Sequence, residues 1–244
     1  MIDFCTNFNI ILNHISTMSV SGYGLVEVKS DALYDEDSFY INQNYNDNIY
    51  VKTKLLAENE IYKSLKDGLI ANIYRAGNLT NSFNNLKAQI NSKENGFLNR
   101  LRSIKESGVV PEELKNFEME FTPVDYCADA IVKIITSLPI NKNINIYHLY
   151  NNRSVPIETF IELLNEFGTT VHNANKNEFV ETIMKNSYNP EELRGFINHI
   201  NLNLSFKSND EIFSNKVTIK KLKSLEFEWP EITENYLKNI IIGL

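Results

Sequence analysis

The chain has 244 residues, of which 43% are apolar, and a formal net charge of −7 at neutral pH. This length suits one large domain or two modest ones, and the apolar content is enough for a hydrophobic core, which excludes a disordered chain. The acidic balance argues against nucleic acid or an anionic membrane surface as the main partner, because binding phosphates needs clustered positive charge. We therefore expect a small molecule or another protein as the partner.

Membrane and metal sites are not expected either. No apolar run approaches the roughly 18 to 20 residues of a membrane span, and the N-terminus lacks the basic-then-apolar order of a signal peptide. A cytoplasmic location follows as an expectation. Cys5 and Cys127 are too few and too far apart for a disulfide framework. Together with the four histidines they match no metal-ligand spacing, so no metal is expected.

The first predicted elements are two strands with a helix between them. Branched apolar residues within 8–17 are typical of a strand buried on both faces. A long polar loop follows, and a helix is expected at about 49–66, with Asp47 or Asn48 as its N-cap and Gly68 just past its end. Residues 69–75 form the second apolar strand. Because strand, loop, helix and strand make a crossover unit, the order predicts a parallel sheet.

The later segments are mostly helical. Helices are expected near 96–106 and 123–138, and a third short strand at 145–150. Ser154 and Pro156 have the order of a cap followed by a proline, which predicts a helix that closes at Gly168. From there to Leu244 the pattern indicates helices with short breaks. The fold class is therefore α/β, with three parallel strands and a mostly helical second part.

Tyr50 and Lys54 form the first candidate for chemistry. Their i, i+4 spacing puts both side chains on one face of the predicted helix, where an ammonium beside a phenol favours the phenolate and tunes the tyrosine as a proton donor. The pattern alone is weak, because chance predicts roughly one such pair in this composition, and Tyr62 with Lys66 repeats it. Position favours Tyr50, since Tyr62 lies roughly 18 Å further along the helix, away from the strand end where α/β folds bind ligands.

Four segments in this order resemble the extended short-chain dehydrogenase/reductases, and more narrowly the terminal thioester reductase domains of nonribosomal peptide synthetases. They are HISTMSVSG (14–22), YVKTKLLAE (50–58), IYRAGNLT (73–80) and FTPVDYCADAIV (121–132). The resemblance covers nearly the whole chain. It implies a partial Rossmann-like sheet from residues 1–80 and 121–150, and a substrate-binding subdomain from 81–120 and 151–244.

The resemblance also implies roles for individual residues. Thr17, Tyr50 and Lys54 match the family's catalytic Thr, Tyr and Lys. Tyr50 and Lys54 would also contact the cofactor, and Arg75, Gly77 and Asn78 match the segment that lines the nicotinamide side of its pocket.

One departure from the family pattern concerns the cofactor phosphates. The family has a glycine-rich turn after its first strand, and this chain has none. Its glycines stand at positions 22, 24, 68, 77, 96, 108, 168, 195 and 243. We therefore expect the chain to be the C-terminal part of a longer reductase, inactive by itself and binding NADPH weakly or not at all. Whether Met1 is a natural start is left open.

The implied activity is NADPH-dependent release of a phosphopantetheine-bound acyl or peptidyl thioester from a carrier protein, as an aldehyde or an alcohol. The acyl group, the product and the choice of NADPH over NADH stay open. Two alternatives also remain, a nucleotide-sugar epimerase or dehydratase and a non-catalytic module that docks a carrier protein. Finally, the strand within 8–17 would have an open edge at Ile10, Ile11 and Leu12, which predicts self-association.

Overall fold

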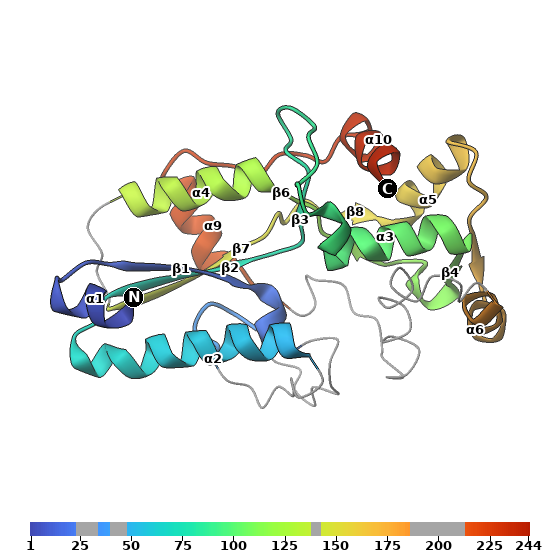
Figure 1. Cartoon of the computed structure of the whole chain (residues 1–244). Coiled ribbons are helices and arrows are strands. Elements are labelled where there is room, and N and C mark those ends of the chain that lie inside the picture. Colours follow the sequence, from blue (N-terminus) through green and yellow to red (C-terminus); the bar gives the residue numbers. More distant parts are fainter. Residues whose placement is uncertain (23–33, 40–47, 138–142, 186–212) are drawn as a thin grey trace. The chain divides into compact units, whose positions relative to one another are not determined.

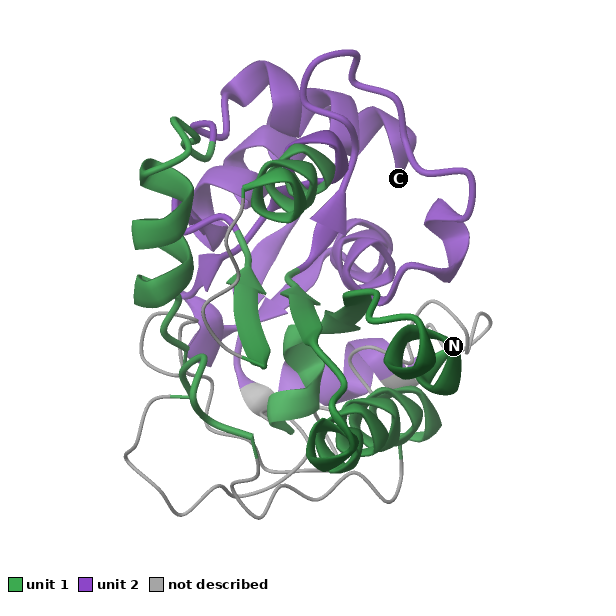
Figure 2. Cartoon of the chain, turned by 90° about the vertical axis from the view of Figure 1, so that its left-hand side faces the viewer, with its two compact units in different colours: residues 1–77, 127–150, 212–229 green, residues 78–126, 151–211, 230–244 purple. Residues whose placement is uncertain are grey.

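The structure is a computed structural model and describes residues 1–22, 34–39, 48–137, 143–185 and 213–244 (Figure 1). The chain divides into two compact units, drawn in green and purple in Figure 2. Unit 1 comprises residues 1–77, 127–150 and 212–229, and unit 2 comprises residues 78–126, 151–211 and 230–244.

Unit 1 is built on a three-stranded parallel sheet. Its strands are β1 (Leu12–Thr17), β2 (Ala71–Ala76) and β7 (Ile144–Leu149), in the order β1-β2-β7. Leu12 pairs with Ala71 and Ala71 with Ile144, so the strands start in register. All six residues of the central strand β2 are buried, as expected of a parallel strand covered on both faces. The predicted α/β fold with three parallel strands is confirmed.

Helices cover both faces of this sheet. Figure 1 shows α1 (Ile2–Asn7) and α2 (Ile49–Ser64) on one side and α4 (Val124–Thr136) on the other. A further helix of this unit, α9 (Lys216–Lys223), contacts β7. The face toward α1 and α2 is closed by a buried apolar cluster of Cys5, Ile61, Leu69, Ala71 and Ile73.

The ends of α2 follow the sequence signals. The Asn48 side chain accepts a hydrogen bond from the Val51 backbone N–H at 3.0 Å, which caps the helix as predicted. The helix ends at Ser64, two residues before the expected end, and a short 3₁₀ turn leads to Gly68. Gly68 has φ +92°, a left-handed conformation that glycine adopts at little cost. These ends set the position of Tyr50 and Lys54 in the first two turns.

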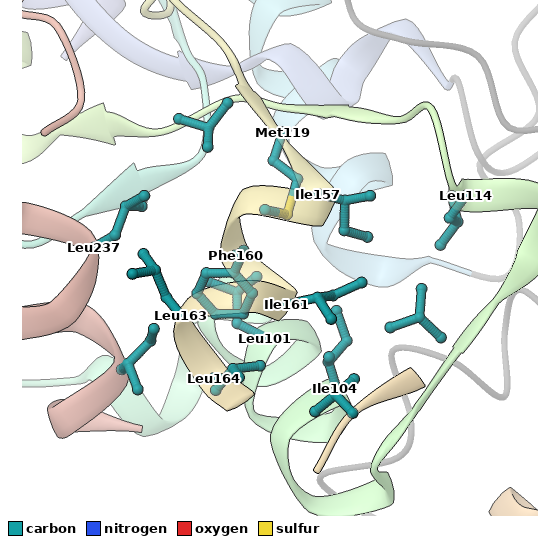
Figure 3. Close-up of a cluster of buried hydrophobic side chains, with 14 of the residues drawn as sticks. Leu101, Ile104, Leu114, Met119, Ile157, Phe160, Ile161, Leu163, Leu164 and Leu237 are labelled. Carbon is teal, nitrogen blue, oxygen red and sulfur yellow. The ribbon is translucent and has the colours of Figure 1, made fainter. Parts of the chain in front are cut away.

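In the described part of unit 2, four helices pack around one apolar core. The helices are α3 (Gly96–Ser107), α5 (Ile157–Glu166), α6 (Lys176–Lys185) and α10 (Glu234–Gly243). Leu101 and Ile104 of α3 meet Phe160 and Leu164 of α5 in a large buried cluster, shown in Figure 3. The mostly helical character of the later segments is thus confirmed, while residues 186–212 lie outside the described part.

Three small sheets accompany these helices and were not predicted. They pair β3 (Leu79–Thr80) with β6 (Thr122–Pro123), β4 (Val109–Pro111) with β9 (His172–Ala174), and β5 (Glu118–Met119) with β8 (Val155–Pro156). Strands of two or three residues are too short to show an alternating pattern. β8 also displaces the expected start of the next helix: Pro156 occupies the N-cap position of α5 and no side chain caps it.

Candidate active site

Thr17 lies at the C-terminal end of β1 and is almost fully buried. Its hydroxyl oxygen accepts a hydrogen bond from the Ser19 backbone N–H at 3.2 Å and so caps the 3₁₀ helix Met18–Ser21. The same hydroxyl lies 3.3 Å from the Ser19 hydroxyl, to which it donates. Thr17 therefore has a local structural task at the strand end, and its catalytic role stays a prediction.

Tyr50 and Lys54 lie on one face of α2, as their spacing predicted. The Lys54 ammonium is 6.0 Å from the centroid of the Tyr50 ring, within the range of a cation–π contact. The ammonium also donates to the backbone carbonyl of Ile15 in β1 at 3.0 Å. The Tyr50 side chain is 56% exposed, and no hydrogen bond of its hydroxyl occurs within the described ranges. The arrangement is an exposed phenol beside a fixed ammonium, near the end of a parallel strand.

The second Tyr-x-x-x-Lys pair has a different setting. The Tyr62 ring stacks on Phe39 with centroids 4.8 Å apart. Lys66 lies beyond the end of α2, in the 3₁₀ turn. This agrees with reading Tyr62 as a helix-surface and packing residue.

A side chain that lines a cofactor pocket must be accessible, but the Arg75 side chain is not. It is fully buried in β2 and forms an ion pair with Glu58 of α2, with 2.8 Å between Nη2 and Oε2. Its Nη1 donates to the Ser38 carbonyl at 2.9 Å and lies 3.1 Å from Nε2 of His148. The guanidinium is thus occupied by protein groups. If this segment lines a cofactor pocket, it does so through its backbone and through Gly77 and Asn78, not through the Arg75 side chain.

His148 in β7 completes this buried cluster as a neutral ring. Burial first, and the Arg75 charge second, lower the pKa of His148 to about 3. The neutral ring donates from Nδ1 to the Ser214 carbonyl at 2.8 Å and accepts from Arg75 at Nε2. Since the ring cannot take up a proton near neutral pH, we assign it to structure rather than to acid–base chemistry.

Gly77 and Asn78 follow β2 directly. The Gly77 N–H donates to the Leu149 carbonyl at 2.9 Å, which extends the pairing of β2 with β7 by one bond. The Asn78 N–H donates to the carboxylate of Glu120 at 2.8 Å. Glu120 is buried and also accepts from the Thr122 hydroxyl. Burial raises the pKa of Glu120 to about 7.

Sequence reasoning did not find Glu58 or Glu120. Glu58 stands four residues after Lys54 and eight after Tyr50, on the same stripe of α2, and that spacing was a usable signal. Glu120 had no such signal, because its partner Asn78 is distant in sequence and reaches it only through the pairing of β3 with β6.

Among the residues that the structure describes, no group of three or more His, Cys, Asp or Glu side chains could hold a metal ion. Within the same ranges no helix is long and apolar enough to cross a membrane.

Comparison with protein families gives a match over more than half of the chain. The profile of an NAD-binding family described as the male sterility protein matches residues 1–131. No protein of curated function matches significantly.

Solved structures resemble the chain over nearly its whole length. A thiolation-reductase di-domain of an archaeal nonribosomal peptide synthetase shares 27% identity at a TM-score of 0.80, over 99% of this chain and 50% of that one. The reductase domain of the aureusimine biosynthetic cluster shares 21% identity at a TM-score of 0.82, over 99% of this chain and 62% of that one. The terminal reductase domain of the myxalamid pathway shares 18% identity at a TM-score of 0.73, over 96% of this chain and 57% of that one. The resemblance to terminal reductase domains is confirmed, and the chain spans about half to three-fifths of the length of these relatives.

Proposed function

Because the chain belongs to the NAD-binding family of the male sterility protein, we propose that it is part of an NADPH-dependent thioester reductase. The substrate is an acyl or peptidyl thioester on the phosphopantetheine of a carrier protein, and the product is an aldehyde or an alcohol. One observation carries the proposal: the Tyr50 phenol lies exposed beside the Lys54 ammonium, which is anchored to β1 two residues before Thr17.

The donor set fits the nicotinamide end of the cofactor. Lys54 uses one of its three N–H donors on the Ile15 carbonyl, which leaves two for ribose hydroxyls. The segment Gly77–Asn78 follows a strand of a parallel sheet, where α/β folds bind dinucleotides. The pyrophosphate end has no counterpart, because the sequence lacks a glycine-rich turn. We propose that this chain alone binds NADPH weakly and does not turn over.

The residues of the chain would handle the carbonyl oxygen and its proton. NADPH, when bound, supplies the hydride that reduces the thioester carbon. Tyr50 donates its phenolic proton to the carbonyl oxygen, and Lys54 stabilises the phenolate left behind. Thr17 turns its hydroxyl from Ser19 to that oxygen as negative charge builds on it. The hemithioacetal hydroxyl then returns its proton to the Tyr50 phenolate as the C–S bond breaks. The departing thiolate takes up a proton from solvent, which leaves the aldehyde and the free carrier thiol.

The experiment uses the complete reductase that contains this chain, with a carrier protein loaded with a short acyl group. We expect NADPH oxidation that depends on the loaded carrier, with aldehyde or alcohol formed in proportion to the NADPH consumed. Conversion of a nucleotide sugar to its epimer or dehydration product, without net consumption of NADPH, would instead favour the epimerase-type alternative. Binding of the carrier without NADPH consumption would leave a docking module.

A further inference from the structure

The face of α2 that carries Tyr50 and Lys54 also carries a buried acid. Glu58 has no solvent exposure, whereas the other acid of this helix, Glu60, is exposed. Its Oε1 accepts from the Ser16 hydroxyl at 2.5 Å. Ser16 is the residue between Thr17 and Ile15, whose carbonyl binds Lys54. α2 is therefore joined to the end of β1 at two successive residues.

The same carboxylate joins α2 to the central strand. Arg75 approaches it with Nε at 3.2 Å from Oε1 and with Nη2 at 2.8 Å from Oε2, so both oxygens are held in a fork. Arg75 is held in turn by the Ser38 carbonyl and His148, and its guanidinium lies 4.9 Å over the ring of Tyr34. Glu58 thus has one defined position relative to both β1 and β2.

A buried ion pair is not the simplest way to stabilise a helix on a sheet. The desolvation of both charges offsets most of their attraction, and apolar side chains of similar volume often serve as well. In some proteins a buried polar or ionic group instead specifies one register of packing. In α2 that register decides where Tyr50 and Lys54 stand, because they lie two turns and one turn before Glu58.

We propose that Glu58 is a positioning residue for Tyr50 and Lys54. Ser16 and Arg75 hold the Glu58 carboxylate, which fixes α2 against the ends of β1 and β2. This inference rests on the proposed function for its relevance to catalysis. The position of Lys54 relative to Tyr50, which the proposal concerns, can be measured without turnover.

The direct readout is the NMR signal of the Lys54 ε-methylene group in the 244-residue chain. The nearby Tyr50 ring displaces this signal by its ring current, and Tyr50→Leu defines the undisplaced position. We compare Ser16→Ala, which removes one anchor and keeps the ion pair, with the double variant Glu58→Met/Arg75→Met, which replaces the pair by apolar volume. Glu60→Gln is the matched control, because Glu60 is an exposed acid on the same helix.

We expect the Lys54 signal to move toward the undisplaced position in Ser16→Ala and in the double variant, and to stay in place in Glu60→Gln. A folded double variant with the wild-type signal would overturn the proposal, and if that variant does not fold, an unmoved signal in Ser16→Ala would do the same. Equal signals in the wild type and Tyr50→Leu would also overturn it.

A second measurement connects the geometry to the reaction. In the complete reductase, Ser16→Ala should lower kcat about 10- to 100-fold and also raise the KM for NADPH, since Lys54, which is proposed to bind the ribose, loses its alignment together with Tyr50. An unchanged kcat would contradict a role for this anchor in the reaction. If the wild-type enzyme reduces no thioester, the proposed function fails, while the Lys54 signal still decides whether Glu58 positions the pair.

Discussion

Replacing Arg75 with methionine should destabilise unit 1 strongly. Met fills much of the volume of the arginine stem but leaves the Glu58 carboxylate buried, with only the Ser16 hydroxyl as a donor. Removing one partner of a buried pair leaves an uncompensated charge, which costs about 3–5 kcal/mol of unfolding free energy. The Ser38 carbonyl and Nε2 of His148 also lose their donor, so we expect a value near the upper end of this range.

The double variant Glu58→Met/Arg75→Met separates the charge from the packing. With both charges removed, most of the loss should be recovered, and a remaining deficit of about 1–3 kcal/mol should reflect the Ser38 carbonyl and His148 Nε2, which still lack their donor. Lys63→Met is the control, because the Lys63–Glu60 pair is exposed on the same helix and is worth at most about 1 kcal/mol.

Urea unfolding followed by tryptophan fluorescence measures these values. Trp229 is the single tryptophan of the chain, is buried and belongs to unit 1, so its signal reports this unit. A loss of less than about 1 kcal/mol in Arg75→Met would refute the reasoning. So would a double variant as unstable as the single one.

Three further predictions concern other parts of the chain. Burial raises the pKa of Glu120 to about 7 from an ordinary 4.5, so the folded chain binds more protons than the unfolded chain between these pH values. Its free energy of unfolding should therefore fall by about 3 kcal/mol as pH rises from about 4.5 to 7. Urea titrations across this range should show this fall in the wild type and not in Glu120→Gln. Gly108 has φ +70°, and a Cβ there would lie 2.9 Å from the Thr170 carbonyl oxygen. Gly108→Ala should therefore lower the free energy of unfolding, measured by thermal unfolding, by about 2 kcal/mol or more, whereas Gly68→Ala, with open space around it, should lower it by about 1 kcal/mol. Equal losses would contradict the role of the close approach. β1 pairs only with β2 within the described sheet, so it has the predicted open edge, although Ile10 and Ile11 precede the strand and only Leu12 belongs to it. We expect self-association at about 100 μM, and Ile15→Lys should weaken it, because the Ile15 side chain on this strand is 45% exposed. Light scattering that shows a wild-type monomer would show that the edge is protected.

The sheet could be predicted because its signals are local. Runs of apolar residues mark β1, β2 and β7, and the intervening helix implies parallel pairing, since a crossover must return the chain to the same end of the sheet. The signals at the ends of α2 are local as well: Asn48 directly precedes the helix, and Gly68 ends the short 3₁₀ turn that follows it. The Tyr50–Lys54 juxtaposition followed from helix periodicity alone.

The buried network could not be predicted in the same way. Arg75 meets Glu58 through the register of α2 against β2, which no local pattern specifies. The α9 helix gives a second example: the Thr218 hydroxyl accepts from the His148 N–H at 2.8 Å and donates to Glu36 at 2.9 Å, although these residues are far apart in sequence. A helical pattern at 216–223 could not tell that this helix packs against β7. Arg75 illustrates the consequence: the family resemblance placed it in the segment that lines the cofactor pocket, and its ion pair with Glu58 could not be predicted from the sequence.

The measurement that tests the central claim most directly compares Tyr50→Phe with Tyr62→Phe in the complete reductase. Both tyrosines stand on α2 with a lysine four residues later, but only Tyr50 lies beside an ammonium that is fixed to β1. NADPH-dependent reduction of a carrier-bound thioester should fall about 10²-fold or more in Tyr50→Phe, with NADPH affinity nearly unchanged, and should stay close to wild type in Tyr62→Phe. Wild-type turnover in Tyr50→Phe would contradict the assignment of Tyr50 as the proton donor.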